Sequence, residues 1–133
     1  MLVLHLPNGR EIHELATPLP GEWVGNYPDA YDPHPQGDVG ETRAFRRYLK
    51  KHGIETLLYA GFSADQCLTW TRPTSIAPMA AEGFNVIMVR DATTTGADVP
   101  FDLQRSIEQQ VEVLYGATTT TGNVVAALTA GDS

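Results

Sequence analysis

The sequence predicts an α/β fold built around a parallel sheet, and three observations lead to this prediction. Residues 56–60 and 85–89 are short, continuous apolar runs, which is the pattern of strands covered on both faces. The stretch at 67–82 between them is long enough for a crossover helix. Amphipathic helical patterns lie before the first run and after the second. A right-handed βαβ unit is therefore expected across these segments.

Length and composition set the scale of this fold. The chain has 133 residues, of which 42% are hydrophobic and 19% are charged, and both values are ordinary for a globular protein. At this size one compact domain buries roughly two thirds of its unfolded surface, and a second full domain does not fit. We therefore expect a single domain over residues 1–133, irregular at 1–40 and with an α/β core at 41–133.

The charge balance narrows the class of partner. The formal net charge is -7, whereas affinity for nucleic acid comes mainly from lysine and arginine. The apolar run that begins at Met1 is interrupted by His5 and stopped by Pro7, which fits neither a signal peptide nor a membrane span. We expect a cytoplasmic protein that acts on a small molecule and has neither nucleic acid nor a membrane as its partner.

The first forty residues predict little regular structure. Residues 2–6 are expected to form a strand, and residues 22–24 are expected to form a second, short one. The segment 26–40 contains three prolines, two glycines and three aspartates, a composition typical of loops. Because it is too long for a simple connection, we expect it to be a lid or an insertion.

A helix is expected at residues 41–52, directly before the first apolar run. Its apolar side chains Phe45, Tyr48 and Leu49 fall on one face, and Gly53 follows where a left-handed cap is wanted. The basic side chains of this helix are interpreted as a solvated face rather than as a binding patch. They are Arg43, Arg46, Arg47, Lys50 and Lys51.

The remaining elements follow from proline positions and apolar spacing. Pro73 and Pro78 must start, kink or break the crossover helix. Residues 103–114 carry four apolar side chains at helical spacing, so a helix is expected with this stripe against the sheet. Residues 118–121 are expected to form a last strand, and Asn123 is expected to cap a final helix.

Cys67 is the one cysteine of the chain, so its role must be that of a single thiol. It follows the predicted strand at 56–60, and open α/β sheets bind ligands beyond the carboxyl ends of their strands. We expect Cys67 to begin the crossover helix, where unpaired N–H groups favour a thiolate and can hold a developing oxyanion. The alternative is that Cys67 is a small buried hydrophobic residue.

Two stretches, residues 53–68 (GIETLLYAGFSADQCL) and residues 83–93 (GFNVIMVRDAT), resemble the core of the isochorismatase-like cysteine hydrolases. That family shows a GI-x-T-L-hydrophobic-x-x-G-x-x-T/S-D/N-x-C stretch followed by G-aromatic-x-V-x-x-V-x-D-A-T. Both blocks agree in residue type, order and separation. The resemblance implies a three-layer α/β/α sandwich with a mostly parallel sheet. It also implies hydrolysis of amides or vinyl ethers of small molecules.

The same resemblance assigns roles to residues around the cysteine. It makes Cys67 the nucleophile, with the backbone N–H groups of Cys67 and Ser63 as the oxyanion hole. The peptide between Phe62 and Ser63 falls where the family has a cis bond that does not precede proline. Phe62 is expected to contact the substrate, and Asp65 is expected to fix the turn rather than to react.

The chain also departs from the family pattern. The family has an aspartate at the end of its first strand and a lysine on a later strand, and neither has an evident counterpart here. The resemblance therefore implies a truncated domain that begins after the aspartate strand. Asn26 lies near the position of the lysine and is expected to bind substrate, with His34 a less plausible candidate. If residues 2–6 were the first family strand instead, His5 would occupy the position of the aspartate.

The missing aspartate bears directly on activity, since general acid-base assistance is typically worth about 10²- to 10⁴-fold. An acidic residue of the 26–40 loop, such as Asp29 or Asp32, is a candidate replacement. The simpler interpretation of these two residues is that they are solvated turn residues.

We expect a small-molecule hydrolase that cleaves an amide or related bond through a covalent intermediate on Cys67. Two alternatives stay open: a catalytically inactive or truncated domain that serves as a binding or oligomerisation module, and a redox or carrier role for the thiol. No cofactor and no metal are expected, because the histidines show no paired helical spacing. A homo-oligomer is expected, because a truncated sheet leaves an unpaired strand edge.

Overall fold

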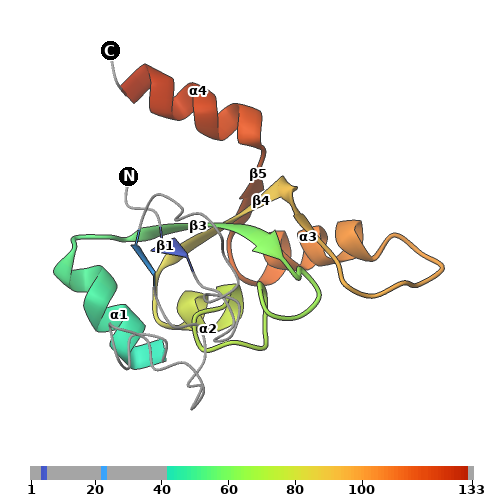
Figure 1. Ribbon diagram of the computed structural model, residues 1–133, viewed down its shortest axis with the longest axis horizontal. Coiled ribbons are helices and arrows are strands. Elements are labelled where there is room, and N and C mark those ends of the chain that lie inside the picture. The colour runs from blue at the N-terminus through green and yellow to red at the C-terminus, as the bar shows by residue number, and fades with distance from the viewer. Residues whose placement is uncertain (1–3, 6–21, 24–41, 132–133) are drawn as a thin grey trace. The chain divides into compact units, whose positions relative to one another are not determined.

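The computed structural model describes residues 4–5, 22–23 and 42–131 (Figure 1). The chain divides into two compact units, Met1–Ile54 and Glu55–Ser133, each of which is described by itself. The expectation of a single domain stays a prediction.

The described residues of the first unit form two short strands and one helix. Strands β1 (Leu4–His5) and β2 (Glu22–Trp23) pair in parallel and lie within the predicted strands at 2–6 and 22–24. The predicted loop at 26–40 lies outside the described residues.

Helix α1 (Thr42–Lys51) confirms the helix predicted at 41–52. Its residues Phe45 and Leu49 are buried, and its five basic side chains are exposed, as a solvated face requires. Gly53 follows with a φ of +69° and donates its N–H to the Lys50 carbonyl oxygen at 3.0 Å, which is the expected left-handed cap.

The second unit holds a three-stranded sheet in the order β3-β4-β5, with both pairs parallel. Its strands are β3 (Thr56–Phe62), β4 (Asn85–Thr94) and β5 (Ala117–Thr119). The predicted parallel sheet is therefore confirmed. Strand β4 runs beyond the predicted end at residue 89 because, after a register shift, Gly61 pairs with Thr93 and Phe62 with Thr94.

One face of this sheet forms the core of the second unit. Side chains of β3 and β4 on this face are buried together with those of helices α2 (Ile76–Ala81) and α3 (Leu103–Leu114). Figure 1 shows both helices on one side of the sheet. The fully or nearly fully buried residues of this core include Tyr59, Val86, Met88, Ile76, Met79, Ile107 and Val111.

Within the described residues of the second unit, no element covers the other face of β3. Alternate residues of this strand, from Thr56 to Phe62, are exposed, and Leu58 and Phe62 are 42% and 68% exposed. The expectation that this strand is covered on both faces is therefore wrong for β3. The continuous apolar run predicted the strand but not the packing of its second face.

The crossover between β3 and β4 differs from the prediction. Residues 64–70 form a series of turns, and α2 begins only at Ile76, so the expectation that Cys67 begins a helix is wrong. Pro78 is the third residue of α2, where its missing N–H would have had no intrahelical acceptor. The crossover is tied to β3 by Tyr59, whose buried hydroxyl donates to the Thr74 carbonyl oxygen at 2.7 Å. Burial raises the pKa of Tyr59, so this donor keeps its proton.

Helix α4 (Thr121–Gly131) follows β5 after one residue. Its cap is Thr120 rather than the expected Asn123, because Thr120 Oγ1 accepts the Asn123 N–H at 3.2 Å. Asp91 on β4 adds a second anchor, since its carboxylate accepts the N–H and the hydroxyl of Thr121 at 2.8 and 2.6 Å. The helix then extends away from the sheet (Figure 1).

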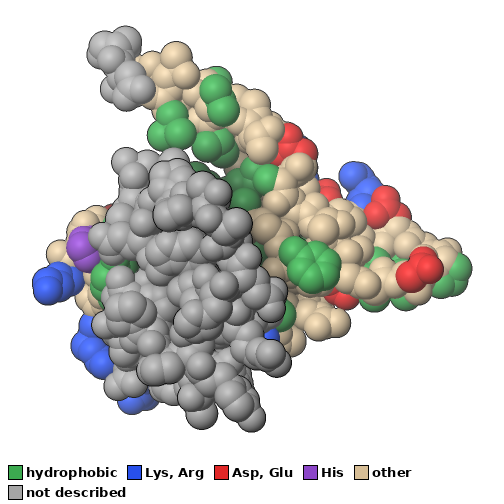
Figure 2. Space-filling model, in the orientation of Figure 1, with side chains coloured by type: hydrophobic (Ala, Val, Ile, Leu, Met, Phe, Trp, Pro, Cys, Tyr) green, Lys and Arg blue, Asp and Glu red, His purple; other side chains and the backbone are tan. Residues whose placement is uncertain are grey.

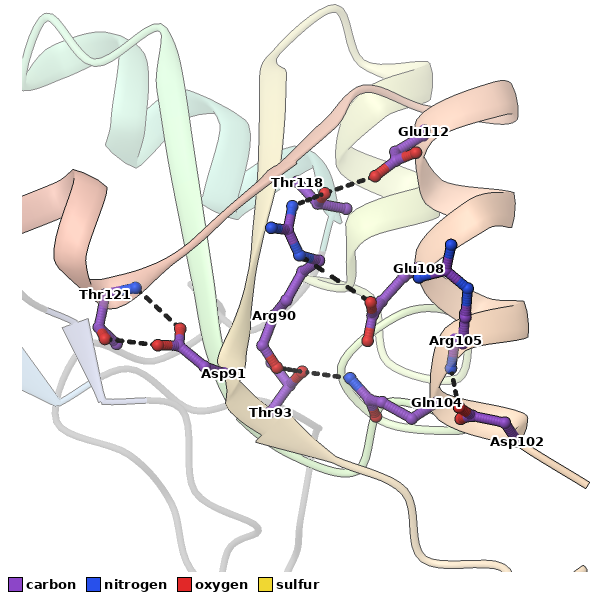
Figure 3. Close-up of polar contacts among 10 residues, drawn as sticks. All are labelled: Arg90, Asp91, Thr93, Asp102, Gln104, Arg105, Glu108, Glu112, Thr118 and Thr121. Atoms are coloured by element: carbon purple, nitrogen blue, oxygen red, sulfur yellow. Dashed lines mark hydrogen bonds and ion pairs between the residues drawn. The ribbon is translucent and has the colours of Figure 1, made fainter.

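Polar contacts connect β4, β5 and α3 (Figure 3). Arg90 Nη1 donates to Thr118 Oγ1 at 2.7 Å, and this hydroxyl donates to Glu112 Oε1 at 2.6 Å. Arg90 Nε also lies 4.0 Å from Glu108 Oε1. Because partly exposed pairs contribute little stability, we interpret these contacts as orienting α3 along the sheet.

The first turn of α3 holds both ends of the loop at 95–101. Before it, Gln104 Nε2 donates to Thr93 Oγ1 at 2.8 Å (Figure 3). After it, Asp102 Oδ1 caps α3 by accepting the Arg105 N–H at 3.0 Å. The loop therefore leaves β4 and enters α3 from defined positions.

Candidate functional site

The candidate site lies at the carboxyl end of β3, the end where parallel α/β sheets bind their ligands. The peptide bond between Phe62 and Ser63 is cis, as the sequence resemblance implies. Ser63 and the following Ala64 are buried, whereas Phe62 presents its ring to solvent. The strand thus delivers a fixed backbone with one exposed aromatic side chain to the start of the turn.

The Ser63 carbonyl oxygen organises the turn that carries the cysteine. It accepts the N–H groups of Gln66 and Leu68, both at 3.0 Å. Between these two donors lies Cys67, and among the described residues no acceptor contacts the backbone N–H of Cys67 or that of Ser63. One backbone donor at the start of the turn and one within it therefore have no acceptor in that part of the chain.

Cys67 is a free, half-buried thiol. Its carbonyl oxygen accepts the Ser75 hydroxyl at 2.6 Å, and Ser75 Oγ in turn accepts the Arg72 N–H at 2.9 Å. The Leu68 carbonyl oxygen accepts the N–H of Ile76, the first residue of α2, at 3.1 Å. The crossover therefore holds the cysteine by its backbone. Helix α2 begins nine residues later, so Cys67 lies on a turn and not at a helix N-terminus.

Asp65 connects this turn to the loop after β4. Its Oδ1 accepts the Ser63 hydroxyl and the Gly96 N–H, the latter at 2.7 Å, and its Oδ2 accepts the Ala97 N–H at 3.2 Å. The hydrogen bond from Ser63, followed by that from Gly96, lowers the pKa of Asp65 below its ordinary value. The carboxylate is therefore ionised at neutral pH and acts as an acceptor.

The loop after β4 approaches the turn closely. The Ala64 N–H donates to the Thr94 carbonyl oxygen at 2.8 Å. A Cβ atom at Gly96 would lie 3.1 Å from Ser63 Oγ and 3.4 Å from the Phe62 ring, so the absent side chain permits this contact. Sequence reasoning missed this loop. The signal that could have found it is that residues 94–97 follow the neighbouring parallel strand.

The structure brings together only part of the expected site. Phe62, Ser63 and Cys67 lie on one short segment, with Asp65 among them. The substrate-binding candidate Asn26 and its alternative His34 lie outside the described residues, as do the candidate bases Asp29 and Asp32. The third candidate for that role, His5, is the last residue of β1.

The described residues show neither a metal-binding cluster nor a helix that could span a membrane. Within residues 4–5, 22–23 and 42–131, no group of three or more histidine, cysteine, aspartate or glutamate side chains is arranged to hold a metal ion. Over the same residues, every helix is too short or too polar to cross a bilayer.

Comparison with known proteins gives one family and one fold match. The sequence matches the Isochorismatase domain family over residues 4–124. A solved structure of an isochorismatase-like hydrolase from Alkaliphilus metalliredigens is similar to this chain, with a TM-score of 0.56 and 15% sequence identity. The match covers 86% of this chain and 55% of that chain, and at this identity it concerns the fold alone. No curated protein shows a significant sequence match.

The contacts of Asp65 predict how its carboxyl group titrates. Its pKa should lie below the ordinary value of about 3.9 for an aspartate. A carboxyl whose pKa is lowered by folding binds fewer protons in the folded state, so stability rises with pH in this range. The contribution should be complete above the unfolded pKa and should be lost as pH falls through the folded pKa. A ¹³C NMR titration of the Asp65 carboxyl measures the midpoint, and a midpoint at or above the ordinary value would contradict the assigned contacts.

Proposed function

The chain belongs to the isochorismatase domain family, and on that premise we propose that it hydrolyses an amide or related bond of a small molecule with Cys67 as nucleophile. In the first half-reaction the thiol loses its proton to a base, and the sulfur attacks the carbonyl carbon. A carbon–sulfur bond forms, the carbon–nitrogen bond breaks, and the departing amine takes up a proton. Water then attacks the thioester, the carbon–sulfur bond breaks, and the thiol regains its proton.

The observation that carries this proposal is that two backbone donors without an acceptor among the described residues lie on the segment that bears the thiol. The N–H groups of Ser63 and Cys67 have no acceptor among the described residues, and they lie on the turn that bears the only thiol of the chain. Tetrahedral intermediates of acyl transfer are stabilised by such donors when their positions are fixed in advance. Here the hydrogen bonds of the Ser63 carbonyl oxygen, with that of the Cys67 carbonyl oxygen, hold the backbone of the turn in place.

Substrate contacts are proposed for two residues. Phe62 is 68% exposed and directly precedes the proposed oxyanion donor Ser63, so its ring suits the apolar part of a small substrate. Asn26 is proposed as a second contact from the family resemblance alone. The proton acceptor is proposed to be a group from a second subunit, because Asp29 and Asp32 of the 26–40 segment are more simply interpreted as solvated turn residues.

Self-association is the second part of the proposal. Helix α4 contains no charged side chain, and its Val125 and Leu128 are 61% and 42% exposed. Figure 2 shows hydrophobic side chains gathered over this helix. An isolated helix of this length is marginal in water, so burial of its apolar side stabilises it. We assign this surface to a second copy, because two chains of net charge -7 repel each other least where their contact surfaces are uncharged.

The proposal includes a cytoplasmic location and a single domain, both supported by the composition of the sequence. A catalytically inactive domain that binds a ligand or partner is the alternative function. The observation that favours it is the absence from the sequence of any lysine before Lys50, where the family has its catalytic lysine.

Removal of the thiol tests the catalytic proposal. Wild-type protein should hydrolyse at least one member of a panel of small primary amides, and Cys67→Ala should reduce the rate to background, because it removes the proposed nucleophile. Hydrolysis is followed by ammonia release. The matched control is Val113→Ala, which truncates a side chain that is 80% exposed and should leave the rate unchanged.

A second measurement distinguishes a catalytically inactive domain from an active enzyme whose substrate is missing from the panel. Iodoacetamide should alkylate Cys67 in the folded protein below pH 8, which intact-mass spectrometry detects. A thiol that reacts only after unfolding, together with an inactive panel, would favour the binding module over the hydrolase.

The α4 surface predicts the state of association. Sedimentation velocity should show a dimer or higher oligomer, and Leu128→Asp should shift it toward the monomer by placing a charge in the contact. Asn123→Asp adds the same charge about 140° away around the helix and should leave the oligomer intact. A monomeric wild type, or equal effects of the two variants, would overturn the assignment of this surface.

A further inference from the structure

Asp65 makes a set of contacts that the proposed reaction does not use directly. Its carboxylate accepts three hydrogen bonds from two segments of the chain. One donor, the Ser63 hydroxyl, belongs to the same turn. The other two are the N–H groups of Gly96 and Ala97, which lie 31 and 32 residues further along the chain. The side chain therefore joins the cysteine turn to the loop after β4.

These contacts act on one end of the proposed oxyanion hole. Ser63 is held by its hydroxyl through Asp65 and by its carbonyl oxygen through the N–H groups of Gln66 and Leu68. With these two groups fixed, little freedom is left for its N–H. The close approach of Gly96 to the Ser63 hydroxyl adds a steric limit on the same residue.

A direct role as the catalytic base does not fit Asp65. An effective general base has a pKa near the working pH, whereas hydrogen bonds hold the pKa of this carboxyl below its ordinary range. Both carboxylate oxygens are already occupied by donors from the protein. Accepting a proton from the thiol would require the loss of at least one of these bonds.

We infer that Asp65 is a positioning residue, which fixes the Ser63 N–H in the oxyanion hole by clamping the loop at 94–97 onto the cysteine turn. The inference rests on the proposed function for its effect on rate. The clamp itself is a property of the folded protein and is measured independently.

The kinetic test uses Asp65→Ala and Asp65→Asn. A misplacement of about 1 Å can cost about 10²-fold in rate, so we expect Asp65→Ala to lower kcat by about 10²-fold. KM should change little, because oxyanion stabilisation acts in the transition state. The kcat of Asp65→Asn should lie between those of the wild type and Asp65→Ala. The asparagine oxygen can still accept from Ser63 and Gly96, but its amide group faces the Ala97 N–H and cannot accept from it.

The matched control is Asp102→Ala. It removes a carboxylate that accepts a backbone N–H at the other end of the same loop. This variant should lose some stability through its missing helix cap, but kcat should change less than about 3-fold. Equal losses of kcat in the two alanine variants would assign Asp65 a merely structural role and overturn the inference.

Amide hydrogen exchange tests the clamp without any substrate. In Asp65→Ala the N–H groups of Gly96 and Ala97 should exchange faster than in the wild type, while that of Arg105 stays unchanged. In Asp102→Ala the Arg105 N–H should exchange faster, while those of Gly96 and Ala97 stay unchanged. If these amides exchange faster in Asp65→Ala but the wild type hydrolyses no substrate, the proposed function is wrong and the clamp stands. If their exchange is unchanged in Asp65→Ala, the clamp is wrong whatever the activity.

Discussion

The parallel pairing of β3 with β4 is the constraint on which the rest of the site depends. Their register, with Phe62 opposite Thr94, brings the carboxyl ends of the two strands to the same level. From that level one strand continues into the cysteine turn and the other into the loop at 94–97. The hydrogen bonds from Ala64 to Thr94 and from Gly96 to Asp65 are then short-range consequences of the pairing. A slip of one residue would turn Ser63 to the other face of the sheet and separate these partners.

Contacts of the sheet with α3, and of the crossover with α2, also hold the cysteine turn and the loop at 94–97. The polar contacts around Arg90 and Thr93 orient α3 against β4 and β5, so the loop that meets the cysteine turn is held where it enters α3 as well as where it leaves β4. Ser75 and the start of α2 also hold the backbone of the turn. The thiol therefore lies on a segment that is held by two other segments of the chain, although no α-helix begins at it.

Sequence reasoning succeeded where local periodicity decides the structure. The apolar runs gave β3 and β4, the spacing of Ile107 and Val111 gave α3, and Gly53 marked the end of α1. It failed where a tertiary contact decides. The turn at 64–70 is stabilised by two N–H groups that donate to the Ser63 carbonyl oxygen, and no periodic pattern in the sequence predicts these hydrogen bonds. The contacts of Asp65 with Gly96 and Ala97 depend on strand register, which a single sequence does not specify.

The proposed reaction requires an acyl intermediate on the Cys67 thiol. Rapid quenching of a reaction with an activated ester of a small carboxylic acid, followed by peptide mass spectrometry, measures this directly. We expect a transient acyl group on the peptide that contains Cys67, which decays as the free acid is released. An ester that is consumed with no acyl group ever found on this peptide, or a thiol that stays unmodified, would contradict it.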